Sequence, residues 1–532
     1  MAATYGAPGV YVEEKPSGSM PLQGVGTAVA AFVGFTRTYN PDAGDPSDPD
    51  GVRPQLITSW PQYERVYGGF VKGALLPHAV KGYFENGGGV CYIVRIPTKG
   101  GDAGLPHRAL PAAGRQEVET LRVEGREPDT SVEVVIEGAP PAEGQDQPAP
   151  EFTLKVLQNG TVREEYPGLS IGKGARGVDK VVNERSKLIR VQVQPVSGMS
   201  LAERAPAQGS YLIEPNGATV VKASPQEMEG SETARTGYQG LAIADDVTMV
   251  AIPDLLTVAT RDDGSLDEEV YLAAQGRLVD WCEASGTRMA ILDAPPGLGA
   301  QGALDWRAAL GKDSAFGAAY HPHLVVANPL ATNGSTNGEK FITVPPSGHV
   351  AGVWARTDAV RGVWKAPANE VVRGVARLAT EITTGEQSLL NPEQVNCIRA
   401  FGANGIRIWG ARTLARQDQS WRYINVRRLF IFIEESIRRG TQWVVFEPND
   451  ADLWARVRRT VSAFLHGLWM QGALVGQTPS QAFFILCDES NNPPGSVDEG
   501  KLVVDIGVAP VKPAEFVIFR ISQWQGGAAT AE

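Results

Sequence analysis

The sequence predicts a multidomain protein of mixed α+β and α/β class. Its 532 residues exceed what one hydrophobic core usually organises, and 42% of them are hydrophobic, which is ample for globular folding. Residues 241–348 alternate apolar strand-like runs with helix-like runs, a pattern typical of a mostly parallel sheet. Residues 99–240 instead show short strands between Pro and Gly clusters, which indicates an all-β unit.

We expect five parts along the chain. They are an N-terminal arm (1–27), a discontinuous α/β domain (28–98 plus 241–348), an all-β insertion on the outer surface (99–240), a C-terminal α/β domain (349–510) and a C-terminal arm (511–532). The chain leaves the α/β domain near Lys99 and returns to it after the insertion.

The discontinuous α/β domain is predicted from elements on both sides of the insertion. Before the insertion, strands at 29–36 and 90–96 flank helices at 60–70 and 74–85. After it come strands at 247–252, 288–293, 318–320 and 324–327, with helices at 267–285 and around 304–310. Because strands that alternate with helices form parallel sheets, we expect both segments to pack as one domain.

An amphipathic helix is predicted over residues 421–439 of the C-terminal domain. Its apolar residues recur at i, i+3, i+4, i+7 and i+11, which defines one buried face. They are Val426, Leu429, Phe430, Ile433 and Ile437. Glu434 and Glu435 stand four residues before Arg438 and Arg439, the favoured order for ion pairs on an exposed face.

A second amphipathic helix is predicted over 451–471, with a strand at 482–487 after it. Residues 506–513 read as a stiff, extended linker because of their prolines. The segments 15–27 and 507–513 carry Pro and Gly and are the natural hinges of the two arms.

Isolated strand candidates stand near both ends of the chain. A lone strand cannot satisfy its backbone groups, so we expect each to join a sheet, either of another subunit or as an edge strand of its own domain. The candidate strand residues are Val10, Tyr11, Val12, Phe516, Val517, Ile518, Phe519, Arg520 and Ile521.

Residues 399–439 are basic in a chain that is acidic overall. Nine arginines against three acidic residues give this region a local charge of plus 6, whereas the whole chain carries −11. The region is either a solvated face or a docking surface for an acidic partner. The candidates for docking are Arg427, Arg428, Arg438 and Arg439. Reversing Arg427 and Arg428 to Glu is expected to impair docking without unfolding the chain.

The spacing of the cysteines and the character of the N-terminal residues indicate the compartment in which the protein folds. Cys91, Cys282, Cys397 and Cys487 are widely scattered and form no CxxC, so reduced, buried thiols are expected. Residues 1–20 lack the basic start and apolar core of a signal peptide, and no run reaches 18 apolar residues. We therefore expect neither a signal peptide nor a transmembrane helix.

Few residues suggest catalysis or metal binding. Asp254 and Asp293 each follow a strand, where α/β sheets often place ligands, but helix capping explains them equally well. His321 and His323 are possible metal ligands in type, yet no further His or Cys cluster stands nearby, so a structural pair is expected. We expect no catalytic residue, no cofactor and no metal.

Several motifs follow one another between His349 and Pro448. They are Ala351-Gly-Val-Trp-Ala-Arg-Thr-Asp, Gly362-Val-Trp-Lys-Ala-Pro-Ala-Asn, Leu390-Asn-Pro, Trp409-Gly-Ala-Arg-Thr-Leu and Trp421-Arg-Tyr-Ile-Asn-Val-Arg-Arg. In this order and spacing they closely resemble the C-terminal domain of the tail sheath proteins of contractile phages and contractile injection systems. The resemblance continues through Phe446-Glu-Pro-Asn, Cys487-Asp and Pro513-Ala-Glu-Phe, and Pro8-Gly-Val-Tyr-Val matches the extended arm of that family.

The resemblance implies a structural subunit rather than an enzyme. It implies a helical, six-start homo-oligomer around an inner tube, with baseplate and tail-terminator proteins as further partners and with no nucleic acid or membrane insertion. It also implies assembly in the bacterial cytoplasm before the subunit becomes part of a tail or injection particle, and these two kinds of particle stay open. The alternative is an α/β hydrolase-like or nucleotide-dependent enzyme. Against that class, Gly311-Lys312 is followed by Asp313 where a phosphate loop needs Ser or Thr.

Overall fold

A nine-stranded mixed sheet forms the centre of the computed structural model. The structure describes residues 22–48, 50–97, 105–126, 131–138, 151–158, 160–213, 223–261, 263–331 and 340–520. The strand order is β16-β19-β18-β13-β12-β11-β1-β3-β2. In chain order the strands are β1 (Ala30–Phe35), β2 (Gln55–Ile57), β3 (Cys91–Ile96), β11 (Met249–Ala251), β12 (Met289–Asp293), β13 (Gly317–His321), β16 (Glu370–Val371), β18 (Val395–Ala400) and β19 (Ile406–Ile408). The strands from β18 to β3 run parallel, and the antiparallel strands β2, β19 and β16 complete the two edges.

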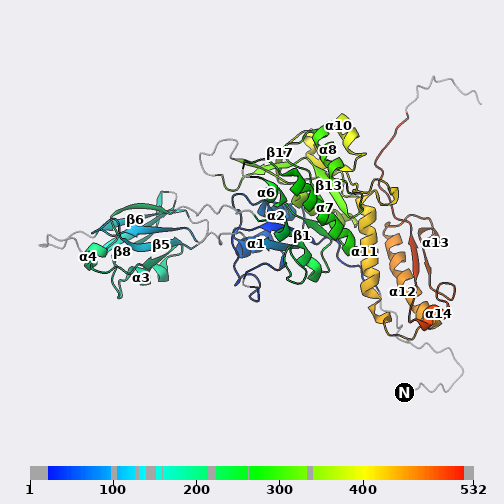
Figure 1. The fold of residues 1–532 in the computed structure, drawn as a ribbon, viewed down its shortest axis with the longest axis horizontal. Coiled ribbons are helices and arrows are strands. Elements are labelled where there is room, and N and C mark those ends of the chain that lie inside the picture. The colour runs from blue at the N-terminus through cyan, green and yellow to red at the C-terminus, as the bar shows by residue number, and fades with distance from the viewer. Residues whose placement is uncertain are drawn as a thin grey trace, which may run out of the picture.

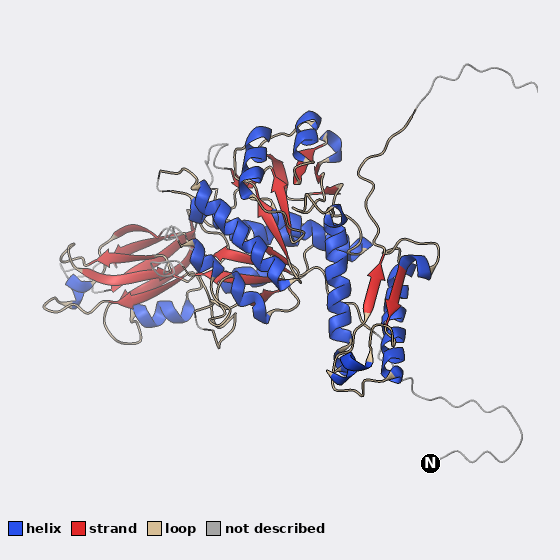
Figure 2. Ribbon diagram, turned by 45° about the vertical axis from the view of Figure 1, so that its right-hand side comes forward, coloured by secondary structure: helices blue, strands red, loops and turns tan. Residues whose placement is uncertain are grey.

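Helices cover both faces of this sheet, which explains why its parallel strands are apolar at successive positions (Figures 1 and 2). All six residues of β1 are buried, and they alternate between two hydrophobic cores. One core is closed by α1 (Trp60–Tyr67), α2 (Leu76–Glu85) and α9 (Ser347–Arg361), and the other by α6 (Leu255–Ala259), α7 (Glu268–Ser285) and α8 (Ala300–Leu310). The segments before and after the insertion therefore share one sheet.

The central sheet extends further along the chain than the sequence predicts. The predicted boundary at residue 349 falls inside α9, which packs against α2, and strands β16, β18 and β19 beyond it join the sheet. Ten residues of α9, on every side of the helix, are buried. A helix that is buried all round shows no amphipathic period, so the sequence pattern gives no sign of it.

The insertion is a separate β unit that projects from one end of the molecule (Figure 1). One antiparallel sheet contains β4 (His107–Pro111), β5 (Glu119–Gly125) and β9 (Ile189–Val193). The other contains β6 (Val132–Gly138), β7 (Glu151–Gln158), β8 (Thr161–Ser170) and β10 (Gly209–Ile213). Inward-facing residues of both sheets form one hydrophobic core, independent of the central cores.

The prediction of an all-β insertion over 99–240 needs two corrections. The unit also contains α3 (Val178–Arg185), whose buried Val178 and Val182 lie one helical turn apart, and the short α4 (Leu201–Arg204). In addition, α5 (Pro225–Glu229) and η1 (Tyr238–Ile243) pack in the central core through Met228, Tyr238 and Leu241. The insertion thus ends before residue 223, because the apolar residues after that point face the central sheet.

A small antiparallel sheet and a short helix lie beside the central sheet. The sheet contains β14 (Leu324–Ala327), β15 (Phe341–Val344) and β17 (Val375–Leu378), with β14 in the middle. The helix α10 (Thr384–Leu390) is capped by Thr383 and Glu386, which exchange hydrogen bonds with each other's backbone. Both lie at the top of the view in Figure 1.

The end of the molecule opposite the insertion is a layer that we call the C-terminal layer, residues 424–511 (Figures 1 and 2). It contains α11 (Ile424–Gly440), α12 (Ala451–Met470), α13 (Pro479–Ala482), β20 (Phe483–Leu486), α14 (Pro494–Asp498) and β21 (Asp505–Val508). Strands β20 and β21 pair with each other, and α12 packs against β20. The short 3-10 turns η2 (Gly402–Asn404), η3 (Gln419–Trp421) and η4 (Gln442–Val444) lie before and after α11.

Two predictions for this layer change with the structure. Residues 506–508, which the sequence suggests are linker, belong to β21, and Gly507 pairs with Phe484. A Cβ on Gly507 would collide with the Phe484 ring, so this glycine allows close packing and is not a hinge. The single buried face predicted for α11 is also too narrow, since Ile424 and Ile431 contact the central core while Leu429 and Ile433 contact the core of the C-terminal layer.

Candidate functional site

The segment of residues 22–27 lies along α11. Val25 N–H donates to Ser436 Oγ at 3.1 Å, and the Phe432 ring occupies the space that a side chain on Gly24 would need. Leu22 fills the space beside Gly440 at the end of the helix. The segment therefore runs antiparallel to α11, with Leu22 at the C-terminal end of this helix.

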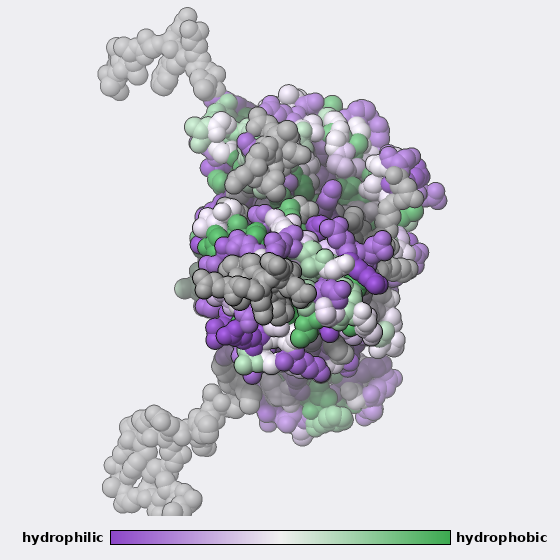
Figure 3. Space-filling model, turned by 90° about the vertical axis from the view of Figure 1, so that its left-hand side faces the viewer, coloured by the Kyte–Doolittle hydropathy of each residue, from purple (hydrophilic) through white to green (hydrophobic). Residues whose placement is uncertain are grey.

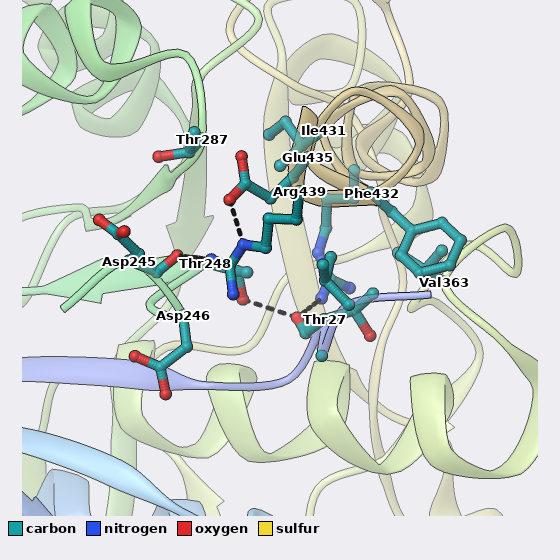
Figure 4. Close-up of a pocket in the computed structure, with 13 residues that line it drawn as sticks. Thr27, Asp245, Asp246, Thr248, Thr287, Val363, Ile431, Phe432, Glu435 and Arg439 are labelled. Carbon is teal, nitrogen blue, oxygen red and sulfur yellow. Dashed lines mark hydrogen bonds and ion pairs between the residues drawn. The ribbon is translucent and has the colours of Figure 1, made fainter. Parts of the chain in front are cut away.

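A buried ion pair fixes this N-terminal segment at Thr27. Arg428 on α11 and Asp358 on α9 form two hydrogen bonds at 2.9 and 2.6 Å, and their side chains are only 3% and 4% exposed. Arg428 also donates to the Thr27 carbonyl at 2.8 Å, and the Thr27 hydroxyl donates to Asp358 at 2.7 Å. Figure 4 shows Thr27 between α11 and the strand that follows Asp246. We call these three residues the N-terminal anchor.

A second, partly buried ion pair fixes the C-terminal segment at Glu515. Arg412 donates to both carboxylate oxygens at 2.9 and 2.7 Å, Asn391 donates at 2.7 Å and the Tyr423 hydroxyl at 3.1 Å. Burial raises the pKa of Glu515, but the hydrogen bonds and charge of Arg412, with the other donors, outweigh this and lower it. We call these four residues the C-terminal anchor.

Directly after the C-terminal anchor the chain exposes an apolar segment. Phe516, Val517, Ile518 and Phe519 are 72%, 69%, 76% and 83% exposed, and residues 509–520 contain no strand. These four residues and Arg520 belong to the predicted C-terminal strand, whereas Ile521 lies outside the described residues, as do Val10, Tyr11 and Val12 of the N-terminal arm. Four consecutive exposed apolar side chains of high β propensity are suited to pairing with another strand.

The sheet of β20 and β21 offers open edges for such pairing. Within the described part of the chain, each of the two strands has the other as its one ladder neighbour. Two-stranded ribbons are marginally stable in water, and unpaired edges expose rows of N–H and C=O groups. The C-terminal layer thus contains a sheet that lacks outer strands, and the segment 516–519 that follows the layer lacks a sheet.

The structure places the four predicted docking arginines in two different settings. Arg427 is buried, and its guanidinium carbon lies 4.4 Å from the centre of the Trp421 ring and 4.7 Å from that of Phe316. It also forms an ion pair with Glu434. Together with the role of Arg428 in the N-terminal anchor, this contradicts the expectation that reversing both charges would leave the fold intact. Arg438 and Arg439 pair with Glu435 and keep side-chain exposures of 55% and 36%.

The two carboxylates that follow strands of the central sheet cap helices. Asp254 accepts hydrogen bonds from the backbone N–H groups of Leu75 and Leu76 at the start of α2, and from that of Phe35. Asp293 accepts from the Ser347 N–H at the start of α9 at 2.8 Å. Both side chains are buried at helix N-termini, where a negative charge is stabilised. Capping accounts for them without catalysis.

We expect these two caps to make stability depend on pH. Burial raises the pKa of Asp254 and of Asp293 to about 7, against hydrogen bonds that lower it. Since the folded pKa lies above the usual 3.8, the folded state holds more protons between about pH 4 and 7. The free energy of unfolding should therefore fall as pH rises through this window, by at most about 1.4 kcal/mol per pH unit for each carboxyl.

The check is urea denaturation of the wild type and of Asp254→Asn at several pH values between 4 and 8. Asparagine does not titrate, so the variant should lose its share of the slope. Its overall stability should also fall at every pH, because the amide places an NH₂ group where one of the two accepting carboxylate oxygens stood. Identical slopes in the two proteins would contradict the expectation.

The remaining candidate residues are buried or paired within the fold. His323 bonds the Ala294 carbonyl at 2.7 Å, and burial lowers the pKa of His321 and His323 to about 4. All four cysteines are free and buried, and Lys312 pairs with Asp280. Over the described ranges, no group of three or more His, Cys, Asp or Glu side chains gathers as a metal site would require. None of the helices in those ranges is long and apolar enough to cross a membrane.

The sequence does not reveal Asp358 and Glu515, the carboxylates that accept the hydrogen bonds of the two anchors. Asp358 lies 70 residues before Arg428, and Glu515 lies 103 residues after Arg412. Glu515 stands inside the recognised motif Pro513-Ala-Glu-Phe, which is the one available signal, but no periodicity relates it to its partner.

Comparison with known proteins places these features in a family. The family profile described as phage tail sheath protein central domain matches residues 245–414, and the profile described as phage tail sheath C-terminal domain matches residues 416–523. Together they span more than half of the chain.

Individual relatives are similar to part of the chain. It is 30% identical over 177 residues to the tail sheath protein of Vibrio phage KVP40, a match that spans 33% of this chain and 26% of the relative. It is 30% identical over 203 residues to the tail sheath protein of Burkholderia phage BcepMu, spanning 37% of this chain and 40% of the relative. The chain thus matches less than half the length of these curated relatives.

Solved structures share the fold over nearly the whole length. The helical sheath of the anti-feeding prophage in its contracted state has a TM-score of 0.58 at 24% identity, covering 98% of this chain and 100% of that one. The contracted sheath complex of the extracellular contractile injection system PVC gives 0.56 at 23% identity, with 98% and 99% covered. Because the two family profiles match consecutive parts of the chain and together span more than half of it, the chain belongs to the phage tail sheath protein family.

Proposed function

We propose that this chain is the structural, non-enzymatic subunit of a contractile sheath, which polymerises as a helical sleeve around an inner tube and contracts to drive the tube through a target envelope. The observation that carries the proposal is the succession of both sheath domains in one chain that also carries an anchored, exposed apolar segment. Baseplate and tail-terminator proteins are the further partners, and the particle is a phage tail or an injection system assembled in the bacterial cytoplasm.

Strand donation between subunits is the contact that would hold this sleeve. Residues 516–521 of one copy and residues 10–12 of another would extend the β20–β21 sheet of a third copy at its open edges. Each ladder hydrogen bond contributes about 0.5–1.5 kcal/mol, and burial of the phenylalanine side chains adds about 1.5–3 kcal/mol each. Because both arms begin at fixed anchors, the connections can persist while the subunit bodies rotate.

The shape of the subunit supports an orientation within the sleeve. The insertion and the C-terminal layer lie at opposite ends of the long axis (Figure 1). Seen from the insertion end, the surface is mainly hydrophilic with small apolar spots (Figure 3). We place the insertion on the outside and the C-terminal layer toward the tube, with Arg438 and Arg439 as the candidates for tube contact that remain partly exposed.

Electron microscopy of the purified chain tests the proposal, alone and with particles from the native host. We expect hollow helical sleeves, and a variant that lacks residues 1–14 should stay a folded monomer because it lacks the N-terminal strand. Dispersed monomers of the full chain in both samples would overturn the function. Normal sleeves from the truncated variant would overturn the role of the N-terminal arm alone.

A further inference from the structure

The turn between α11 and α12 holds a phenylalanine in an unfavourable backbone conformation. Val445 has φ −65° and ψ 129°, Phe446 has φ 69°, and Glu447 N–H donates to the Val444 carbonyl at 3.1 Å. This is the geometry of a type II turn, whose third residue favours glycine because a side chain is strained there. Phe446 is 103% exposed, so no packing within the chain compensates for the strain.

The turn is also held rigidly on the side of α12. Glu447 pairs with Arg456 at 3.0 Å, and Asn449 accepts from Trp454 Nε1 at 2.8 Å. Asn449 donates in turn to the Lys501 carbonyl at 2.8 Å, beside the end of α14. Strained backbone conformations persist mainly where they serve a function. A strained, fully exposed aromatic residue on a firmly held turn is therefore expected to be a binding residue.

An aromatic groove of complementary charge lies elsewhere on the same molecule. It has a volume of about 970 Å³ and runs between the C-terminal segment 511–517 and α10. Trp364 and Trp409 line it, and Trp409 is 37% exposed. Its cationic residues are Arg361, Lys365, Arg399 and Lys512, of which Lys365 pairs with Glu370. Its one acid, Glu515, is neutralised by Arg412. The turn carries the acids Glu447, Asp450 and Asp452, of which Glu447 is paired with Arg456.

We propose that Phe446 of one copy inserts into this groove of a second copy. The inference rests on the proposed function, because it requires copies of the chain to stack. Charge complementarity favours a second copy, with the acidic turn entering the basic groove beside the two tryptophans. An aromatic side chain that becomes buried between aromatic walls is the type of residue that dominates interface energetics.

The position of the two surfaces gives the contact its consequence. The groove lies beside α10, at the top of the view in Figure 1, whereas the turn lies near the end of α14, at the lower right of that view. A contact between two different surfaces is heterologous, so it can repeat from copy to copy, as a closed ring or as an open helical filament. The proposed sleeve requires the open form. It would supplement the contacts of the strand arms with a contact between the folded bodies of neighbouring subunits.

Substitutions at Phe446 separate assembly from folding. Phe446→Gly removes the ring and relieves the left-handed strain, so its melting temperature should equal or exceed that of the wild type. The protein concentration at which half of the chain sediments as sleeves should rise at least about tenfold. Phe446→Ala should assemble as poorly, and Phe446→Tyr should assemble normally. Wild-type assembly by Phe446→Gly would overturn the inference and leave the proposed function standing.

Cysteine cross-linking tests the partner surface. The four native cysteines are buried, so Phe446→Cys and Trp409→Cys chains each carry one accessible thiol. A mixture of the two should form a disulfide-linked dimer under mild oxidation, at several times the yield of either chain alone. Sleeves that form without this cross-link would overturn the assignment of the groove, as would a preferential cross-link from Trp409→Cys to a Tyr11→Cys chain, which would assign the groove to the N-terminal arm.

Discussion

Replacing Arg428 with glutamate should destabilise the subunit by about 3–5 kcal/mol or more, the usual cost of breaking a buried ion pair. The change leaves Asp358 without its partner, places a second carboxylate beside it and removes a donor to the Thr27 carbonyl. Urea denaturation followed by tryptophan fluorescence is suitable, because Trp354 lies 4.9 Å beneath the Arg428 guanidinium.

The matched control lies on the same helix. Arg438→Glu alters a side chain that is 55% exposed, so its effect on the free energy of unfolding should stay below about 1 kcal/mol. The double variant Arg428→Met with Asp358→Leu should recover most of the lost stability, since a buried pair can be replaced by apolar residues at little cost. Equal effects of the Arg428 and Arg438 reversals would contradict the anchor.

Replacing Phe516 and Phe519 with aspartate should abolish sleeves while the monomer keeps its stability. Both side chains are more than 70% exposed in the monomer, so the free energy of unfolding should change by less than about 0.5 kcal/mol. In a donated strand these residues would become buried, and a buried unpaired carboxylate is strongly unfavourable. Sedimentation and negative-stain microscopy provide the measurement.

A control for general surface charge is available in the insertion. Val162 and Leu201 are each 48% exposed there, and changing both to aspartate should leave sleeve formation unaffected. If the Phe516 and Phe519 variant still forms sleeves at the wild-type concentration, the C-terminal segment is not the connecting strand.

Elements with a local signal could be predicted from the sequence. Helix α7 begins one residue after Asp267, whose side chain accepts from Val270 N–H, and ends at Gly286 in the left-handed region, as the pattern over 267–285 indicates. Helix α12 likewise begins one residue after Asp450, whose side chain accepts from the Leu453 N–H. The alternation of apolar strands and helices also predicted the parallel sheet that joins the two segments around the insertion.

What could not be predicted depends on contacts between distant parts of the chain. The spacing around Arg427 and Arg428 is the same whether α11 has one buried face or two, so only the packing of both cores shows that these charges are internal. Helix α9 lacks an amphipathic period because it is buried on every side. Asp358 and Glu515 are ordinary acids in sequence, and the fold alone brings them to their arginines.

The contacts at the two ends of α11 make this helix a spacer of fixed length between the C-terminal anchor and Leu22 of the N-terminal segment. Tyr423, just before its first turn, contacts Glu515, and Gly440 at its end contacts Leu22. A helix of 17 residues is about 25 Å long. If neighbours hold both arms, a pull on one arm loads this rod along its axis, parallel to its backbone hydrogen bonds. The rod then keeps the attachment points of neighbouring subunits apart by a constant distance while the lattice around it changes pitch.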